Sequence, residues 1–208
     1  MKKLYQEDLW NKILEEVKLF SNDKTMEYYF KSNILNINNL SDALSLLVSK
    51  NLKSQEIQEE NIAHDVDIAF TNKEIIDAVE EDINEIYHKD PACNYHFQPL
   101  LFYKGFQALQ AYRVANYWAE EKLGFSMYIQ SIVSEKFNVD IHPKAQIGKG
   151  IMIDHASGVV IGETSKVGDY CSIFHGVTLG GVGSEKGQRH PQVGKNVLLS
   201  ANSTIVGN

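Results

Sequence analysis

The chain has 208 residues, which is enough for one or two compact domains with a buried core. Its 20 Lys and Arg against 27 Asp and Glu give a net charge of −7, and the basic residues are scattered, so we expect no nucleic-acid partner. No apolar run approaches the roughly 18 to 20 residues of a membrane helix, and the N-terminal residues turn acidic before a secretory segment forms. We therefore expect a cytoplasmic protein without a membrane anchor. Cys93 and Cys171 are far apart and are expected to be free thiols.

The first two thirds of the chain have the periodicity of α-helices. Apolar side chains recur there at steps of three or four residues. The segments with this pattern are 9–20, 75–87, 100–123 and 126–137. Asp90-Pro91 is expected to end the second of them. We predict an α-helical oligomerisation domain over residues 1–138.

After Asn138 the apolar period changes to six. Each repeat opens with an aliphatic residue, often followed by glycine, and has a small or branched residue four positions later. The opening residues are Ile141, Ile147, Ile153, Ile161, Val167, Ile173, Leu179, Val193, Leu199 and Ile205. The residues four positions on are Ala145, Ile151, Ser157, Ser165, Cys171 and Val177. This repeat predicts a parallel β-helix in which three short strands form a triangular coil of about 18 residues, with the opening aliphatics stacked inside.

The six-residue period is interrupted twice. Two extra residues lie between Ile153 and Ile161, and residues 182–192 lie between Leu179 and Val193. A stacked core cannot absorb insertions, so we expect both to project as loops. The longer one is polar and contains glycine, which suits a substrate-binding loop and a plain connecting loop equally well.

The motifs of the second half resemble those of the left-handed β-helix acyltransferases, and specifically those of the serine acetyltransferase family. They are DIHP (140–143), IGKGIMIDHASG (147–158), VTLGG (177–181) and RHP (189–191), with DPA (90–92) and PLLFYKGFQALQAYRVA (99–115) upstream. The resemblance implies an α+β protein with a left-handed β-helix as the catalytic domain over residues 139–208. That hand comes from the resemblance alone, because general rules favour right-handed crossovers between parallel strands. It also implies acetyl transfer from acetyl-CoA to L-serine, a step of cysteine biosynthesis.

His155 is the candidate general base. Acetylation of serine requires removal of the hydroxyl proton, and the reference pKa of histidine, about 6.5, lies near operating pH. Asp140 lies fifteen residues earlier, which in coils of this length places it on the adjacent rung, where it would orient the ring. The resemblance implies the same pair. The alternatives are that His155 is a turn residue bonded to backbone and that Asp140 is a turn residue before Ile141.

Serine is a zwitterion and requires groups of both charges. Arg189 suits its carboxylate, because a guanidinium can donate two parallel hydrogen bonds. Asp154 and Asp90 suit its ammonium group, and the resemblance adds His190 as a substrate contact. Asp90 before proline equally suits a residue that only ends a helix.

Acetyl-CoA has amide groups that can pair with exposed backbone at glycine-rich edges. Gly180, Gly181 and Ala201 are the proposed contacts, although the glycines also suit the turns of the repeat. A thiol of pKa about 8.5 leaves without strong acid, so direct transfer suffices and no metal is expected. Cys171 occupies a packing position and Cys93 has no adjacent base, so neither is expected to form an acyl-enzyme.

Other functions remain open from the residues alone. The hexapeptide repeat also occurs in enzymes that acylate sugars or amines. A β-helix carbonic anhydrase would use zinc ligands drawn from His142, His155, His175 and His190. A non-enzymatic scaffold that binds cysteine synthase is the third alternative.

The resemblance further implies assembly and regulation. Family members form trimers with active sites between subunits, and the helical domain would pair two trimers into a hexamer. L-cysteine is implied as a feedback inhibitor, because a thiol replaces the serine hydroxyl with little change of shape. Binding of cysteine synthase requires a C-terminal tail, and the sequence stops at Asn208, within the repeat that opens at Ile205. The resemblance implies further coil and a tail after this point, and the sequence leaves open whether the chain continues or the protein manages without these parts.

Overall fold

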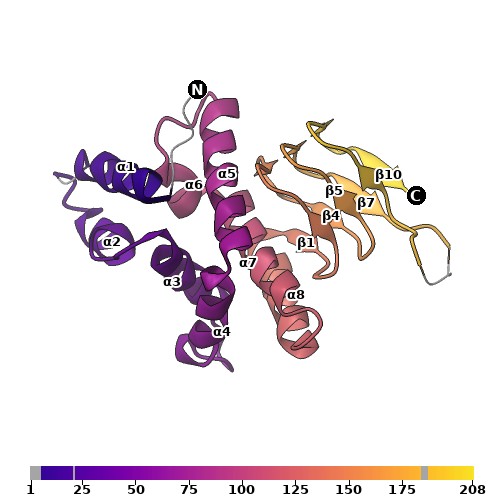
Figure 1. Ribbon diagram of the computed structural model, residues 1–208, viewed down its shortest axis with the longest axis horizontal. Coiled ribbons are helices and arrows are strands. Elements are labelled where there is room, and N and C mark those ends of the chain that lie inside the picture. Colours follow the sequence, from indigo (N-terminus) through magenta and orange to yellow (C-terminus); the bar gives the residue numbers. More distant parts are fainter. Residues whose placement is uncertain (1–5, 21, 184–186) are drawn as a thin grey trace. The chain divides into compact units, whose positions relative to one another are not determined.

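The computed structural model describes residues 6–20, 22–183 and 187–208. The chain divides into two compact units, residues 1–102 and 103–208. The described elements of the first unit are helices, and the second combines two helices with parallel strands (Figure 1). The predicted order, helices followed by parallel β-structure, is confirmed. None of the described helices is both long and apolar enough to cross a membrane.

The first unit consists of seven helical segments in the described residues. They are α1 (Gln6–Lys18), α2 (Glu27–Phe30), the π-helix η1 (Lys31–Leu35), α3 (Leu40–Leu52), α4 (Glu59–Thr71), α5 (Lys73–Lys89) and α6 (Phe97–Phe102). Asn39 and Asn72 begin α3 and α5, because their side-chain oxygens accept backbone N–H groups of the first turn. Helix α5 contains the predicted segment 75–87 and ends directly before Asp90-Pro91, as expected.

A buried polar pair holds part of this unit together. The Glu16 carboxylate on α1 accepts the His96 backbone N–H at 2.6 Å, and its other oxygen lies 2.7 Å from His96 Nδ1. The ring of Tyr87 on α5 stacks on His96, with 3.9 Å between the centroids. Buried charged groups are stable only when paired in this way, so the contact fixes α1 against α5 and the segment before α6.

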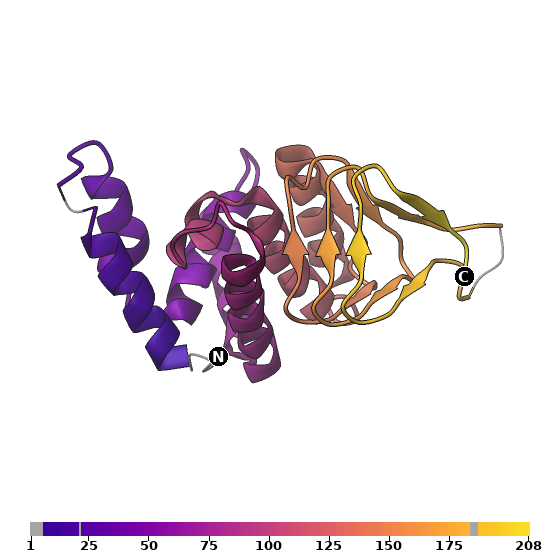
Figure 2. The ribbon, with the colours of Figure 1, turned by 90° about the horizontal axis from the view of Figure 1, so that it is seen from above.

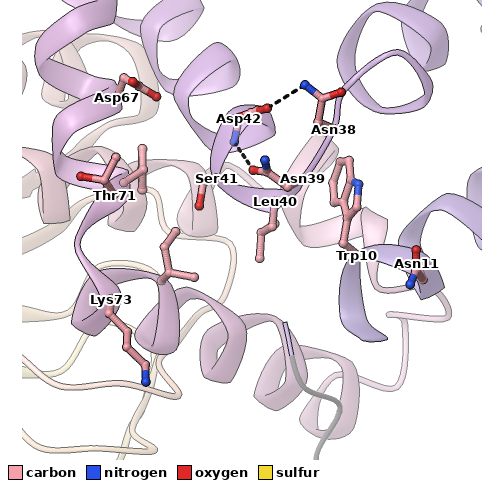
Figure 3. Close-up of a pocket in the computed structure, with 12 residues that line it drawn as sticks. Trp10, Asn11, Asn38, Asn39, Leu40, Ser41, Asp42, Asp67, Thr71 and Lys73 are labelled. Atoms are coloured by element: carbon pink, nitrogen blue, oxygen red, sulfur yellow. Dashed lines mark hydrogen bonds between the residues drawn. The ribbon is translucent and has the colours of Figure 1, made fainter. Parts of the chain in front are cut away.

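A pocket of about 730 Å³ also lies within the first unit (Figure 3). Trp10 of α1, the N-terminal end of α3 around Asn39, and the junction of α4 and α5 around Lys73 line it. The Asn39 side chain is already occupied, because it accepts the Asp42 backbone N–H at 2.9 Å. None of the residues predicted to bind substrate lines this pocket.

The second unit opens with α7 (Lys104–Tyr117) and α8 (Leu123–Phe137). The prediction of one helix over 100–123 is wrong, because Tyr103 is extended, with ψ of 105°, and separates α6 from α7. The apolar period continues through this break and therefore cannot reveal it. Helix α8 confirms the predicted helix over 126–137. Asn138 ends it in the left-handed conformation, with φ of 56°, and the first strand follows at once.

The described residues after Asn138 form ten short strands. They are β1 (Val139–Ile141), β2 (Gln146–Ile147), β3 (Met152–Ile153), β4 (Val159–Ile161), β5 (Lys166–Val167), β6 (Ser172–Ile173), β7 (Thr178–Gly180), β8 (Gln192–Val193), β9 (Leu198–Leu199) and β10 (Thr204–Val206). Each strand pairs in parallel with the strand three positions later, which gives the sheets β1-β4-β7-β10, β2-β5-β8 and β3-β6-β9. The chain thus passes through three sheets in turn, and successive coils stack (Figure 2). Three strands per coil are as predicted.

The register of the strands confirms that the opening aliphatics stack in columns. Ile141, Ile161, Leu179 and Ile205 pair in one column, Ile147, Val167 and Val193 in a second, and Ile153, Ile173 and Leu199 in a third. Asp140 pairs with Val160 and Val160 with Thr178, so these two coils contain 20 and 18 residues. Thr178 pairs with Thr204, so the coil that includes residues 182–192 contains 26. Both insertions are accommodated outside the aligned strands.

One repeat position differs from the prediction. Ser157, four residues after Ile153, is exposed, whereas Val159 is fully buried. The two extra residues follow Ile153. The buried position of the repeat therefore moves by two residues, from Ser157 to Val159. The other residues at this position of the repeat, among them Ala145 and Cys171, are fully buried as expected.

Helix α7 covers the first coil. Tyr112 donates its hydroxyl proton to the Ala145 carbonyl at 2.5 Å, and Asn116 donates to the Pro143 carbonyl at 2.7 Å. Burial raises the pKa of Tyr112 well above its ordinary value, so its hydroxyl remains a donor. The end of a stacked coil needs such a cover, because its backbone and apolar interior would otherwise face water.

Candidate active site

His155 lies at a corner of the coil, between β3 and β4. His155 and Ala156 both have positive φ, 56° and 59°, a conformation that is uncommon for residues other than glycine. Ala156 turns fully inward, whereas 74% of the His155 side chain is exposed. The ring therefore projects from the coil, where it can meet a substrate. Positive φ also occurs at other corners of the coils, at Tyr170, Asn196 and Asn202, so the exposed imidazole is what distinguishes this corner.

Two carboxylates were expected near this ring. Asp154 Oδ2 lies 3.6 Å from His155 Nε2. Asp140 lies in β1 on the adjacent coil and accepts a hydrogen bond from Gln130 at 2.7 Å. The His155 corner does stack on the start of β1, since the Gly158 N–H donates to the Asn138 carbonyl at 2.7 Å. No hydrogen bond joins Asp140 to His155 within the part of the chain that the structure describes, so their pairing stays a prediction.

The first turn of α7 positions this corner. A Cβ atom at Gly105 would lie 2.1 Å from the Ile153 carbonyl oxygen and 3.1 Å from the Ala156 Cβ, so only glycine allows the helix to approach this closely. Lys104 also donates a hydrogen bond to the Ser157 hydroxyl. Sequence analysis missed both residues. A glycine inside the segment 100–123, which was predicted to be helical, was the available signal.

The equivalent corners of the next coils form a column with that of His155. The Gly176 N–H donates to the Ser157 carbonyl at 2.9 Å, and the Asn202 N–H donates to the His175 carbonyl at 2.9 Å. The rings of His155 and His175 are 5.8 Å apart between centroids and inclined at 68°. Ala201, a predicted acetyl-CoA contact, is exposed at the third corner. The column therefore joins the candidate base to one predicted cofactor contact.

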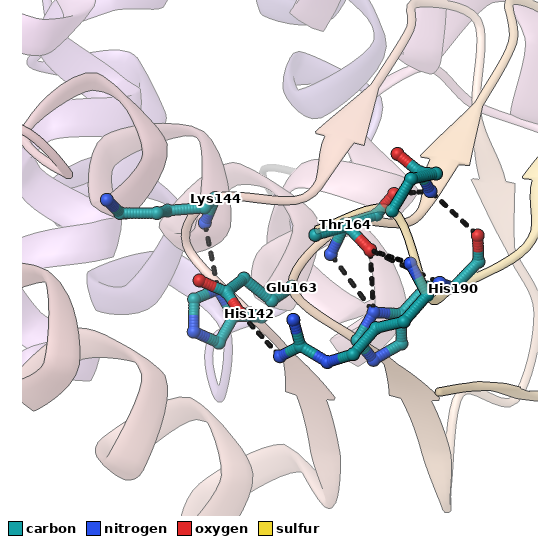
Figure 4. A network of polar contacts seen from close by, with 7 residues as sticks. His142, Lys144, Glu163, Thr164 and His190 are labelled. Carbon is teal, nitrogen blue, oxygen red and sulfur yellow. Dashed lines mark hydrogen bonds and ion pairs between the residues drawn. The ribbon is translucent and has the colours of Figure 1, made fainter. Parts of the chain in front are cut away.

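A second polar cluster, in which Figure 4 labels His190, contains two of the four predicted serine-binding residues, Arg189 and His190. Arg189 donates to Glu163 Oε2 at 2.5 Å. The Thr164 hydroxyl lies 2.9 Å from His190 Nδ1 and accepts the backbone N–H groups of Arg189 and His190 at 3.1 and 3.2 Å. The Thr164 N–H also donates to His190 Nδ1, which leaves the proton of a neutral His190 ring on Nε2. Thr164 thus holds both residues in place.

Two glycines make room for the His190 ring. A Cβ at Gly162 would lie 2.0 Å from the ring, and a Cβ at Gly181 would lie 2.9 Å from its Nε2 atom. Gly181, a predicted acetyl-CoA contact, therefore has a packing role as well. Gly180 ends β7, and a Cβ there would meet its neighbours no closer than 3.6 Å, so packing does not require glycine at this position.

The electrostatics of this cluster favour one protonation state. Burial lowers the pKa of His190, and the Arg189 cation lowers it further. Burial is also the main cause of the lowered pKa of His142, which belongs to the same polar network (Figure 4). The hydrogen bond from Arg189 lowers the pKa of Glu163. The cluster therefore holds neutral imidazoles beside a guanidinium paired with one carboxylate, which is a suitable place to bind another carboxylate.

The two groups of predicted residues occupy different corners. His155 and Asp154 precede β4, whereas Glu163 and Thr164, which hold Arg189 and His190, follow it. Three residues of extended chain separate the corners by roughly 10 Å. Within one chain the candidate base and the candidate carboxylate-binding residue therefore lie toward opposite ends of β4.

The remaining predicted site elements lie elsewhere. Asp90 belongs to the first unit, where its side chain accepts the Ala92 N–H at 2.8 Å beyond the end of α5. The long insertion closes through a hydrogen bond from the Val182 N–H to the Arg189 carbonyl at 3.1 Å, and its residues 184–186 lie outside the described residues. Cys93 and Cys171 are buried, and neither forms a disulfide within the described residues. No group of three metal-binding side chains occurs within the described ranges, so the four histidines form no zinc site there.

Comparisons with known proteins identify the family. Residues 9–111 match the family model "Serine acetyltransferase, N-terminal". The serine acetyltransferase of Haemophilus influenzae is 42% identical over 204 residues, which cover 97% of this chain and 76% of that protein. The solved structure of a Neisseria gonorrhoeae serine acetyltransferase in complex with serine matches with a TM-score of 0.93 at 37% identity, covering 97% of this chain and 84% of that one. A serine acetyltransferase in complex with CoA matches with a TM-score of 0.91 at 39% identity, covering 98% and 86%. The chain belongs to the serine acetyltransferase family.

Proposed function

We propose that this chain transfers an acetyl group from acetyl-CoA to the hydroxyl of L-serine, giving O-acetyl-L-serine and CoA for cysteine biosynthesis in the cytoplasm. The observation that supports this most directly is the exposed imidazole of His155, held at a strained corner with a carboxylate 3.6 Å away. Relatives in complex with serine and with CoA support the choice of substrates.

The reaction is a direct transfer with His155 as the general base. A neutral His155 ring accepts the serine hydroxyl proton as the oxygen attacks the thioester carbonyl carbon. The tetrahedral intermediate then collapses, the C–S bond breaks, and the CoA sulfur takes the proton from the imidazolium. Asp140 is the proposed orienting carboxylate, and Asp154 is the alternative that its distance supports.

Arg189 is the proposed ligand of the serine carboxylate. Its partner Glu163 is itself a carboxylate, so serine can take over a contact of the same chemistry. Asp154 and Asp90 are proposed to receive the ammonium group. His190, with Nδ1 occupied by Thr164, presents its Nε2 proton as a further donor.

The complete site is proposed to need more than one copy of the chain. The corner of His155 and the corner of Arg189 lie at opposite ends of β4. Each copy therefore presents the candidate base on one side of the coil and the candidate carboxylate ligand on another. A trimer of left-handed coils places one half from each of two subunits together. The helical domain over residues 1–138 is proposed to join two trimers into a hexamer.

The cofactor and the inhibitor complete the proposal. Acetyl-CoA is expected to contact Gly180, Gly181 and Ala201, with its thioester near His155. L-cysteine is expected to compete with serine, because its thiol takes the place of the hydroxyl. Neither acetyl transfer nor inhibition by L-cysteine is proposed to need a metal.

The test is an assay of CoA thiol release with L-serine, a sugar and a simple amine as acceptors. Only L-serine should support turnover, and His155→Ala should lower kcat about a hundredfold or more, as expected on loss of a general base. The exposed His64, in the first unit, provides the control, and His64→Ala should retain full activity. Asp140→Asn and Asp154→Asn identify the orienting carboxylate by the larger loss of kcat, whereas loss of an ammonium ligand at Asp154 should raise KM for serine. Turnover of His155→Ala within a few-fold of the parent would exclude His155 as the base.

A further inference from the structure

Gln130 on α8 holds the side chain of Asp140, the proposed orienting carboxylate. Its Nε2 atom donates to Asp140 Oδ1 at 2.7 Å in a partly buried contact between residues ten apart in the sequence. The chemistry of the two groups fixes the direction of this bond, because an ionised carboxylate only accepts hydrogen bonds and an amide nitrogen only donates them. Sequence analysis did not single out Gln130.

The turn at Asn138 brings the two side chains together. Helix α8 ends at Phe137, Asn138 is left-handed, and β1 begins at Val139, so the helix packs against the strand that follows it. Val139 and Ile141 are buried within the coil. Side chains alternate along a strand, so Asp140 between them points outward, where α8 lies. Gln130 therefore meets Asp140 on the outer surface of the coil.

The two candidate orienting carboxylates differ in how they are held. Gln130 fixes Asp140, whereas the side chain of Asp154 accepts no hydrogen bond within the part of the chain that the structure describes. An aspartate without such a bond can rotate about its second side-chain torsion angle, which has only broad preferences. A carboxylate that orients a base must present an oxygen in a fixed direction, because a misplacement of about 1 Å can cost a hundredfold in rate. Asp140 is the carboxylate that the fold prepares for this role.

The hydrogen bond from Gln130 leaves the second oxygen of Asp140 available. Oδ2 accepts no hydrogen bond from any described residue. The corner that holds His155 stacks on the start of β1, because the Gly158 N–H donates to the Asn138 carbonyl at 2.7 Å. The helix thus fixes one oxygen, and the other can accept a ring N–H of His155. Because Gln130 is uncharged, it does not neutralise the negative charge that stabilises an imidazolium.

We propose that Gln130 is a positioning residue, which fixes the Asp140 carboxylate so that its other oxygen orients the His155 ring during acetyl transfer. This inference rests on the proposed function, because it concerns the same base and the same reaction. Gln130 neither gains nor loses a proton and forms no covalent bond. It acts on the chemical step through Asp140, so its loss should lower kcat and leave the binding of serine and acetyl-CoA unchanged.

Two substitutions test this role in the full chain. Gln130→Glu keeps the shape of the side chain and replaces the donor by an oxygen, and Gln130→Met keeps its length without a polar atom. Both should lower kcat about tenfold, which is less than the roughly hundredfold cost of a 1 Å misplacement. KM for serine and for acetyl-CoA should stay within threefold of the parent. The matched control is Gln58→Met, which should keep full activity because Gln58 is exposed and its side chain makes no capping bond.

A double-mutant cycle shows whether Gln130 acts through Asp140. Asp140→Ala leaves Gln130 no carboxylate to hold, so adding Gln130→Met should lower kcat further by less than about twofold. Added to Asp154→Asn, the same substitution should keep its full effect of about tenfold. A tenfold further loss in the Asp140→Ala background would overturn the inference, because Gln130 would then act without Asp140.

The outcomes separate this inference from the proposed function. A parent chain that releases no CoA with serine overturns both. An active parent whose two Gln130 variants keep kcat within threefold overturns the inference alone. A loss in Gln130→Met that is absent from Gln130→Glu shows a packing role and also overturns it. Thermal unfolding checks each variant, and if Gln130→Met fails to fold, Gln130→Glu takes its place in the cycle.

Discussion

The substitution Gly105→Ala tests how closely α7 must approach the corner that holds His155. The added Cβ would lie 2.1 Å from the Ile153 carbonyl oxygen and 3.0 Å from its carbonyl carbon. Both are backbone atoms, so neither can move aside as a flexible side chain can. Ordinary contact begins at 3.4 Å, so the helix and the corner must separate by about 1 Å.

The expected magnitudes differ for stability and for activity. Overpacking of this kind typically costs about 1–3 kcal/mol, and alanine returns at most about 1 kcal/mol through its higher helix propensity. The free energy of unfolding should therefore fall by about 0–3 kcal/mol. A displacement of about 1 Å at the base, in contrast, can lower the rate about a hundredfold. We therefore expect activity to fall by about 10- to 100-fold in a protein that remains folded.

Gly124→Ala is a matched control for this substitution. Gly124 is the second residue of α8, as Gly105 is of α7, and a Cβ there would meet nothing within 4 Å. Its alanine variant should keep full activity and equal or exceed the parent in stability. The measurements are kcat by thiol release and the free energy of unfolding by urea denaturation. If Gly105→Ala matches Gly124→Ala in both, the close approach of α7 does not position His155.

Two further predictions concern residues that sequence analysis did not single out. Thr164→Val removes the oxygen that accepts the N–H groups of Arg189 and His190, so KM for serine should rise about tenfold with kcat within threefold, whereas Thr164→Ser should match the parent. Equal KM values for both variants would contradict this role. Burial raises the pKa of the half-buried Glu80 from 4.5 to about 7, with Asp77 and Glu81 adding to the shift. The folded state thus holds this proton more tightly than the unfolded chain. The contribution of protonated Glu80 to the free energy of unfolding is therefore complete below pH 4.5 and is lost as pH rises through 7. After allowance for solvent screening, Glu80→Gln should raise the free energy of unfolding by about 1 kcal/mol at pH 8 and by little at pH 5; an equal gain at both would contradict the assignment.

The regular part of the fold follows from the sequence because each coil repeats the same environment. Ile153, Ile173 and Leu199 occupy one column, and the residue spacing alone predicts that they share it. The helix α8 and its end at Asn138 follow in the same way from apolar period and strand onset. These features depend on local spacing, which a single sequence contains.

The missed features depend on contacts between distant segments. Gly105 reads as a weak helix residue until Ile153 is placed against it. Thr164 gains its role only because the long insertion folds back to bring Arg189 and His190 to it. The carboxylate at 3.6 Å from His155 belongs to its neighbour Asp154, whereas spacing between coils had favoured Asp140. The repeat period and the motifs identify the candidate site residues. The residues that these contact depend on how the loops fold.

Both departures from the six-residue period hold candidate site residues. The coil with His155 contains two more residues than the coil with His175 at the equivalent corner. The extra length lets Ala156 fill the interior while the His155 ring projects, whereas the ring of His175 is half-buried. The longer insertion brings Arg189 and His190 back onto the coil in the same way. Because the stacked interior fixes the inward residues of each regular coil, an insertion at a corner gives side chains such as His155 and Arg189 room to project toward a substrate.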